Sequence, residues 1–321
     1  MITITLKNFE QDLIAASATT PVLLDIWAEW CGPCKQLGPV LEKLEVEYGG
    51  RFTLAKVNAD EEPEIAGQLS QMFGVRSIPF CVMFAGGQPV DGFVGALPAD
   101  KIREFLDKHV ASEAAVEAEQ ELGEAETLAA SGDADQALVK LQQALEHDPT
   151  NVEARLELIK LLLERGQVEP AKELFQAIAA QASGPLADPR VAAFAAYLAA
   201  CDTAPRARSA QALADAIAAN KRDFEARFEL AQTHFAAGRF TAAMDELLEI
   251  IMRDKKWQDE LARKTYVAIL EVMTKPQPKA AAKAPGKPDA KSGLELAGKA
   301  VVVSADPLID QYRRKLSMAL F

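Results

Sequence analysis

The chain has 321 residues, of which 49% are hydrophobic and 26% charged, and its formal net charge is −12 at pH 7. This composition excludes a disordered, collagen-like or disulfide-scaffold chain, and the length predicts two or three domains. Residues 1–110 carry a net charge of −6, residues 111–274 of −11 and residues 275–321 of +5, so the acidic body is not expected to bind nucleic acid. Because no apolar run approaches the ~18–20 residues of a membrane span and no signal-peptide pattern occurs, we expect a cytoplasmic protein without membrane contact.

Strand and helix patterns alternate over the first 110 residues. Apolar, β-branched runs predict strands at 2–5, 22–27, 52–57, 80–84 and 90–94. Helical periodicity predicts helices at 9–17, 34–48, 62–73 and 98–110. This alternation predicts an α/β sheet that is covered by helices on both faces, in a first domain at 1–112.

The second predicted strand leads into the motif Cys31-Gly32-Pro33-Cys34. A thiolate is the nucleophile of disulfide exchange, and the N-terminus of a helix stabilises its charge. Cys31 would therefore attack a substrate disulfide and Cys34 would resolve the mixed disulfide, while Pro33, which has no N–H group, tunes the stabilisation of the thiolate. The alternative is half of a zinc site, but the other cysteines and the histidines are scattered, so we expect no metal and no other cofactor.

The stretch DIWAEWCGPCK at 25–35 resembles the active-site segment of the thioredoxin family. Further matches follow in order: Pro39 in the helix, Lys56 in a central strand, Ile78–Pro79 in a loop and Gly95 after the last strand. The resemblance implies a thioredoxin fold with a cis Pro79 that faces the cysteines. It also implies a substrate surface formed by Trp30, Gly32, Pro33, Ile78, Pro79 and Gly95.

Asp25 is a lone carboxylate within the apolar run LLDIW. Burial raises the pKa of a carboxyl group, so Asp25 is a candidate base toward Cys34, and Lys56 beside it would moderate its charge. The alternative is a purely structural buried pair of Asp25 and Lys56. Cys81 lies in a predicted central strand, and either a small buried apolar residue or a third redox-sensitive thiol is compatible with that position.

A helical repeat follows at 113–274. The stretch NVEARLEL at 151–158 matches DFEARFEL 72 residues later, and Gly132, Gly166 and Gly238 are each followed by an alanine after five residues and a large apolar residue after nine. This spacing resembles tetratricopeptide repeats. It predicts an all-α array with units at 118–151, 152–185 and 222–256, a degenerate unit at 187–220 and a closing helix at 257–273. Such an array binds proteins or peptides, and a passive scaffold is the alternative.

A Lys/Ala/Pro-rich segment at 275–303 predicts a flexible linker before a terminal helix at 304–321. Asp306 is a good N-cap and Pro307 a good first helical residue. The helix would either pack back onto the repeats or enter a groove of another protein. The residues of its apolar stripe and the two arginines beside it are candidates for docking: Ile309, Tyr312, Arg313, Arg314, Leu316 and Leu320.

The order of the parts and the ending YRRKLSMALF are similar to those of the bacterial chaperedoxins. This resemblance implies a redox-active holdase chaperone of the stress response, which binds unfolding or oxidised client proteins and protects or reduces their cysteines. It also implies transfer of clients to the GroEL-type chaperonin, through the terminal helix, and to the DnaK system. Since both motif cysteines are present, we expect disulfide reduction, with electrons from thioredoxin reductase or glutathione. The alternatives are a specialised thioredoxin-type reductase whose repeats select its partners, and an adaptor whose first domain only binds.

Overall fold

The computed structural model describes residues 1–274 and 306–320. The described residues belong to two compact units, the first over Met1–Glu113 and the second from Ala114 onward. The predicted linker at 275–303 lies outside the described residues, as do the first two residues and the last residue of the predicted terminal segment. None of the described helices is both long and apolar enough to cross a lipid bilayer.

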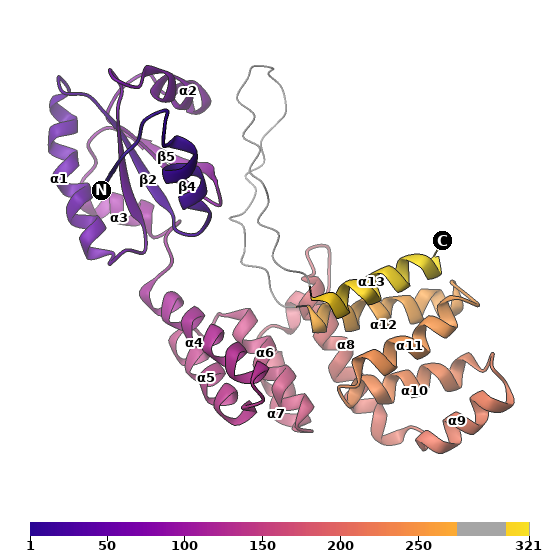
Figure 1. Cartoon of the computed structure of the whole chain (residues 1–321). Helices are drawn as coiled ribbons and strands as arrows, with labels where there is room; N and C mark the ends of the chain where they lie inside the picture. The colour runs from indigo at the N-terminus through magenta and orange to yellow at the C-terminus, as the bar shows by residue number, and fades with distance from the viewer. Residues whose placement is uncertain (275–305, 321) are drawn as a thin grey trace. The chain divides into compact units, whose positions relative to one another are not determined.

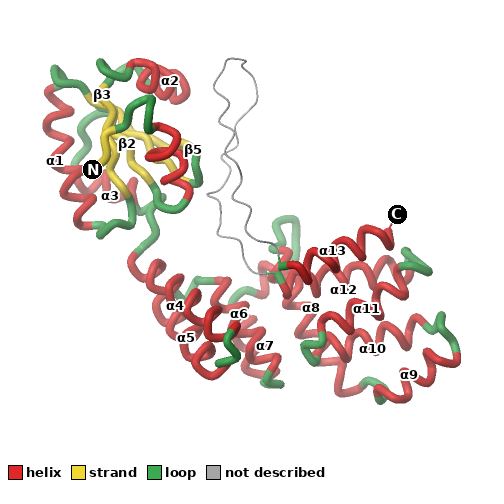
Figure 2. The backbone as a smooth tube through the Cα atoms, viewed as in Figure 1, coloured by secondary structure: helices red, strands yellow, loops and turns green. Residues whose placement is uncertain are grey.

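Five strands form one mixed sheet in the first unit, in the order β1-β3-β2-β4-β5 (Figures 1 and 2). They are β1 (Ile2–Thr3), β2 (Val22–Trp27), β3 (Thr53–Asn58), β4 (Phe80–Ala85) and β5 (Gln88–Val94). β3 runs parallel to its neighbours β1 and β2, whereas β4 is antiparallel to β2 and β5 is antiparallel to β4. Gly86 and Gly87 have the positive φ angles that the tight β4–β5 turn requires.

Alternation along β2 divides the core of the first unit into two layers. Leu24 and Ile26 pack toward α2 (Pro63–Phe73) and the N-terminal turns, and Leu23 packs toward α1 (Gly32–Glu47) and α3 (Ala99–Leu106). The predicted sheet with helices on both faces is confirmed. The helix predicted at 9–17 differs from a regular α-helix. Its residues form a π-helix at Phe9–Ala15 that continues into a 3-10 turn at Ala16–Ala18. The Asn8 side chain accepts from the preceding Thr5 N–H (2.7 Å) and does not cap that segment.

The second unit is built from successive antiparallel helices (Figure 1). These are α4 (Glu113–Ala130), α5 (Ala134–His147), α6 (Val152–Glu164), α7 (Val168–Gln176), α8 (Pro189–Thr203), α9 (Ala210–Ala219), α10 (Phe224–Ala236), α11 (Phe240–Ile251), α12 (Trp257–Met273) and α13 (Pro307–Leu320). The predicted glycines lie in the turns within pairs α4–α5, α6–α7 and α10–α11, each with positive φ. The alanine five residues after each glycine is fully buried, which confirms the close approach of the paired helices.

Matching positions of the repeat make the same local contacts. Asn151 and Asp223, which lie 72 residues apart, are both N-caps, and their side chains accept from the backbone N–H of Ala154 (3.0 Å) and Ala226 (2.9 Å). The predicted degenerate unit is the pair α8–α9. It has no glycine between its helices, and a short 3-10 turn at Ala204–Arg206 takes the place of the tight turn.

Candidate functional site

The two motif cysteines lie at the N-terminus of α1 and are joined in a disulfide. Cys31 is the N-cap, and its Sγ accepts from the backbone N–H of Cys34 at 3.2 Å. Both sulfur-bearing residues are buried, whereas Gly32 and Pro33 between them are exposed. In the reduced form the same helix terminus stabilises a Cys31 thiolate, so the geometry suits Cys31 as the attacking nucleophile.

The loop that leads into β4 lies beside the disulfide, at the edge of the sheet where β2 ends. The Ile78–Pro79 peptide bond is cis, as predicted, and Ile78 and Trp27 pack against the buried cysteines. The Gly95 N–H donates to the Pro79 carbonyl at 2.8 Å, and its φ of 89° is a conformation that favours glycine. The structure therefore brings Ile78, Pro79 and Gly95 together next to the cysteines.

Trp30 provides an exposed aromatic surface immediately before the motif. Its side chain is 71% exposed, and its indole Nε1 donates to Asp60 Oδ2 at 3.0 Å. This hydrogen bond from the β3–α2 loop holds the ring at the surface. The sequence did not identify Asp60, because nothing in the spacing between residues 30 and 60 indicates which loop approaches the ring.

Asp25 lies in the core of the first unit and is 1% exposed. Asp25 lies on β2, between Lys56 on the neighbouring strand β3 and Cys81 on the neighbouring strand β4. Burial raises the pKa of Asp25 from its ordinary value of 3.8 to about 6; the Lys56 charge and the Cys81 hydrogen bond lower it, and the Glu42 charge raises it. A carboxyl group with this pKa exchanges a proton readily near neutral pH, as the predicted base requires.

Lys56 lies beside Asp25, as expected, but its ammonium group is paired with a different carboxylate. Its side chain is 17% exposed, and its Nζ forms an ion pair with Glu42 Oε1 of α1 at 2.7 Å. The ion pair of Lys56 is therefore with Glu42, although its charge still lowers the pKa of Asp25. Glu42 was missed in the sequence, since its contact with Lys56 depends on how α1 packs on the sheet.

Cys81 is fully buried, which confirms the first of its two predicted interpretations. The structure adds a contact that the sequence did not reveal, since the Cys81 Sγ donates to Asp25 Oδ1 at 3.7 Å. The contact between Cys81 and Asp25 could be predicted if the pairing of β2 with β4 were known, because directly opposed residues share one face of the sheet. That register becomes known only with the fold.

The predicted apolar stripe of the terminal helix faces the repeats, whereas the two predicted docking arginines, Arg313 and Arg314, are exposed. Ile309 and Tyr312 are buried in the core of the second unit, and Leu316 and Leu320 pack at its edge. The Tyr266 hydroxyl donates to the Tyr312 carbonyl at 2.8 Å. Further polar contacts of α13 are Tyr312 Oη with Asp245 (3.2 Å), Lys315 with Asp245 (3.2 Å), Arg313 with Thr274 (3.3 Å) and Lys255 with the Leu320 carbonyl (2.6 Å).

The exposed face of α13 carries Arg314 together with two apolar side chains that lie outside the predicted stripe. Leu308 is 40% exposed and Met318 73%, and Arg314 is also exposed. Met318 borders a groove between α11 and α13 to which Met252, 55% exposed, also contributes. Methionine side chains adapt their shape to different apolar partners, but charged side chains line much of this groove: Asp245, Glu246, Glu249, Lys255 and Lys315.

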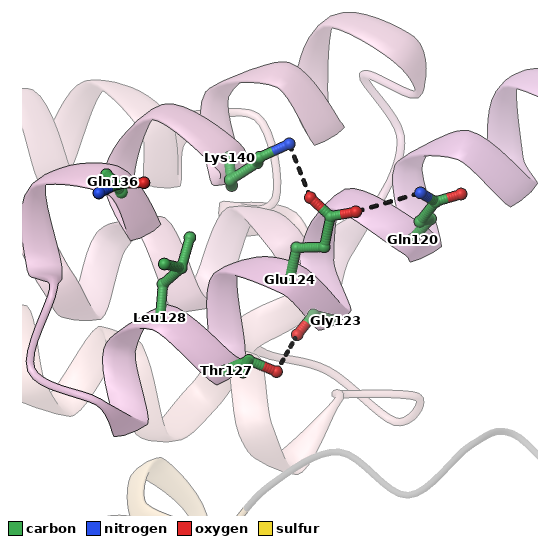
Figure 3. A pocket seen from close by; sticks show the side chains of 7 residues that line it. All are labelled: Gln120, Gly123, Glu124, Thr127, Leu128, Gln136 and Lys140. Atoms are coloured by element: carbon green, nitrogen blue, oxygen red, sulfur yellow. Dashed lines mark hydrogen bonds and ion pairs between the residues drawn. The ribbon is translucent and has the colours of Figure 1, made fainter.

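A second groove lies between α4 and α5 (Figure 3). Its polar groups already bind one another: Lys140 is paired with Glu124 (2.7 Å), which accepts from Gln120 (3.1 Å), and the Thr127 hydroxyl donates to the Gly123 carbonyl (3.0 Å). The side chains that line this groove include no cysteine or histidine. It is therefore a polar surface of the repeats and not a second redox site.

Comparisons with known proteins support both halves of this description. Residues 1–108 match the thioredoxin family, and residues 128–198 and 203–284 match two tetratricopeptide repeat families. Thioredoxin of Chlorobaculum thiosulfatiphilum is 46% identical over 104 residues, which are 32% of this chain and 91% of that protein. Thioredoxin 1 of Nostoc sp. is 41% identical over 107 residues, which are 33% and 94% of the two chains. The predicted combination of a thioredoxin domain with tetratricopeptide repeats is confirmed.

Proposed function

The chain belongs to the thioredoxin family through its first unit, and from this premise we propose that it is a redox-active holdase chaperone of the cytoplasm. The observation that carries the proposal is the Cys31–Cys34 pair at the start of α1, beside cis Pro79, in one chain with a repeat array. The redox site protects or reduces client cysteines. The array, with the groove between α11 and α13 that Met252 and Met318 border, holds partly unfolded clients.

The disulfide chemistry follows from the helix terminus. In the reduced protein the Cys31 thiolate attacks a client disulfide, so that a Cys31–client bond forms and one client thiolate leaves. Cys34 then attacks Cys31, releases the second client thiolate and leaves the Cys31–Cys34 disulfide that the structure contains. The client gains two electrons, and thioredoxin reductase or glutathione supplies two further electrons that reduce the Cys31–Cys34 disulfide again.

A Cys34→Ser variant tests the redox half of this proposal. Because it lacks the resolving thiol, it should retain a disulfide-containing client as a covalent conjugate that dithiothreitol releases. The matched control is Cys31→Ser/Cys34→Ser, which keeps the fold but has no nucleophile and should capture none. Absence of any Cys31-dependent conjugate would contradict thiol–disulfide exchange with clients.

We further propose that α13 is the contact for the GroEL-type chaperonin, which receives clients together with the DnaK system. With Ile309 and Tyr312 buried against the repeats, the surface available for contact is the exposed face with Leu308, Arg314 and Met318. Arg314→Glu/Met318→Glu should therefore weaken binding to purified chaperonin. Arg222→Glu, at another exposed site of the second unit, is the matched charge control and should bind as the wild type does. Unchanged binding by the double variant would contradict contact through this face.

A further inference from the structure

Cys81 and Asp25 form a buried pair in the sheet of the first unit. They oppose each other directly in the antiparallel β2–β4 ladder, and both side chains therefore point to the face that α1 covers. Cys81 is 0% and Asp25 1% exposed, and the thiol Sγ lies 3.7 Å from Asp25 Oδ1. The contact is thus shielded from water, where a weak donor has its largest effect.

The other charged groups around Asp25 come from β3 and α1. Lys56 lies opposite Asp25 on β3, but its ammonium group is bound to Glu42 Oε1 at 2.7 Å. Glu42 itself is an acidic neighbour that disfavours the charged carboxylate. Cys34, also on α1, is held in the disulfide. The hydrogen-bond donor that the structure gives to the Asp25 carboxylate is Cys81.

We propose that Cys81 is a positioning residue for the disulfide chemistry, whose thiol donates to Asp25 and holds it as a carboxylate that accepts the proton of Cys34. This inference rests on the proposed redox function. It assigns Cys81 a role through Asp25 and not as a third redox thiol, because the sulfur has no access to solvent or client.

The proton transfer belongs to the second step of the exchange. As the Cys34 sulfur attacks Cys31, its proton moves to Asp25, the Cys31–client bond breaks, and the client thiolate takes a proton from water. A carboxyl group that is already protonated cannot accept that proton. Burial favours the neutral form of Asp25, while Cys81 and Lys56 both favour the charged form. The Cys81 thiol remains a donor at neutral pH, because burial and the nearby carboxylate raise its own pKa well above the usual value.

Titration of the Asp25 carboxyl carbon by NMR tests the proposal in the full-length oxidised protein, with Asp25→Asn used to assign the signal. Cys81→Ala and Cys81→Val replace the thiol by smaller and larger apolar groups without a donor. Both should raise the pKa of Asp25 by about 0.5 to 1 unit. Cys81→Ser keeps a donor and should not raise it.

Kinetics give the second readout, because a purely structural residue would not shift a pH profile. The rate of client release from a preformed Cys31–client disulfide should be roughly 2- to 5-fold lower at pH 6 in Cys81→Ala and Cys81→Val. In an Asp25→Asn background, Cys81→Ala should cause no further change in the pH profile. Cys201→Ala removes the buried thiol of the second unit and serves as the matched control, with a wild-type titration and profile.

Two results would overturn the inference. One is an Asp25 pKa that stays unchanged in both apolar variants, and the other is an equal rise in Cys81→Ser, which would reduce Cys81 to packing. The titration uses the resting disulfide form, so it does not depend on turnover. A wild-type protein that reduces no disulfide would contradict the proposed function instead, whatever the titration shows.

Discussion

Burial of Asp25 destabilises the folded protein, and the same residue is the candidate base for the disulfide chemistry. Its folded-state pKa of about 6 lies above the ordinary value of 3.8, because the fold removes the carboxylate from water. Between these two pH values the folded state binds more protons than the unfolded state, so the free energy of unfolding falls as the pH rises. Above pH 7 the raised pKa of Asp25 lowers the free energy of unfolding by about 3 kcal/mol relative to its value below pH 3.8. A residue kept in spite of such a cost is a candidate for function.

Asp25→Asn should therefore stabilise the first unit at high pH and have little effect near pH 4. We expect a gain of about 2–3 kcal/mol at pH 8, measured by urea unfolding. Trp257→Phe in both proteins confines the fluorescence signal to Trp27 and Trp30 of the first unit. A difference between the two proteins that does not change from pH 4 to pH 8 would contradict the raised pKa.

At the scale of the element, β5 depends on one close backbone approach. A Cβ atom at Gly92 would lie 2.8 Å from the Cys81 carbonyl and 3.0 Å from the Phe80 ring. The carbonyl belongs to the neighbouring strand β4 and cannot rotate away. A glycine is needed here because of packing against β4, and its φ angle plays no part.

Gly92→Ala should accordingly destabilise the first unit by about 1–3 kcal/mol. The matched control is Gly123→Ala in α4, where an added methyl group meets nothing within 4 Å and should stabilise that helix by up to about 1 kcal/mol. Urea unfolding of both variants measures these changes. An equal effect of the two substitutions would show that the β4–β5 contact does not limit the strand.

The terminal helix α13 is held mainly by its buried stripe. Ile309→Ala removes a side chain that is 4% exposed and should weaken docking of the helix by about 2–4 kcal/mol. Leu308→Ala, a matched apolar truncation at a side chain that is 40% exposed, should change it by less than about 0.5 kcal/mol. Hydrogen exchange of the α13 amides measures the difference, and equal protection in the two variants would contradict the observed orientation.

Across the whole molecule, local sequence patterns predicted the helices and strands better than they predicted the tertiary contacts between them. Periodicity identified the strands and helices, and the glycine spacing identified the turns of three repeat pairs, because both depend on neighbouring residues. The cis Pro79 was implied by the resemblance to the thioredoxin family, and the position of Cys31 at the helix terminus followed from the motif and the helical periodicity after it. The contacts of Asp25 with Cys81 and of Lys56 with Glu42 could not be predicted, since they depend on strand register and on helix packing. For α13, an amphipathic stripe shows that a helix needs a partner but does not show which one.

We propose that one chain combines a thioredoxin redox site with a holding surface that works without it. The most direct measurement is suppression of the thermal aggregation of a cysteine-free client by wild type and by Cys31→Ser/Cys34→Ser. Such a client has no thiol to exchange, so we expect equal protection by both proteins. Absence of protection by the wild type would contradict the holdase function and favour a specialised reductase. Loss of protection in the serine variant alone would contradict a holding surface independent of the disulfide.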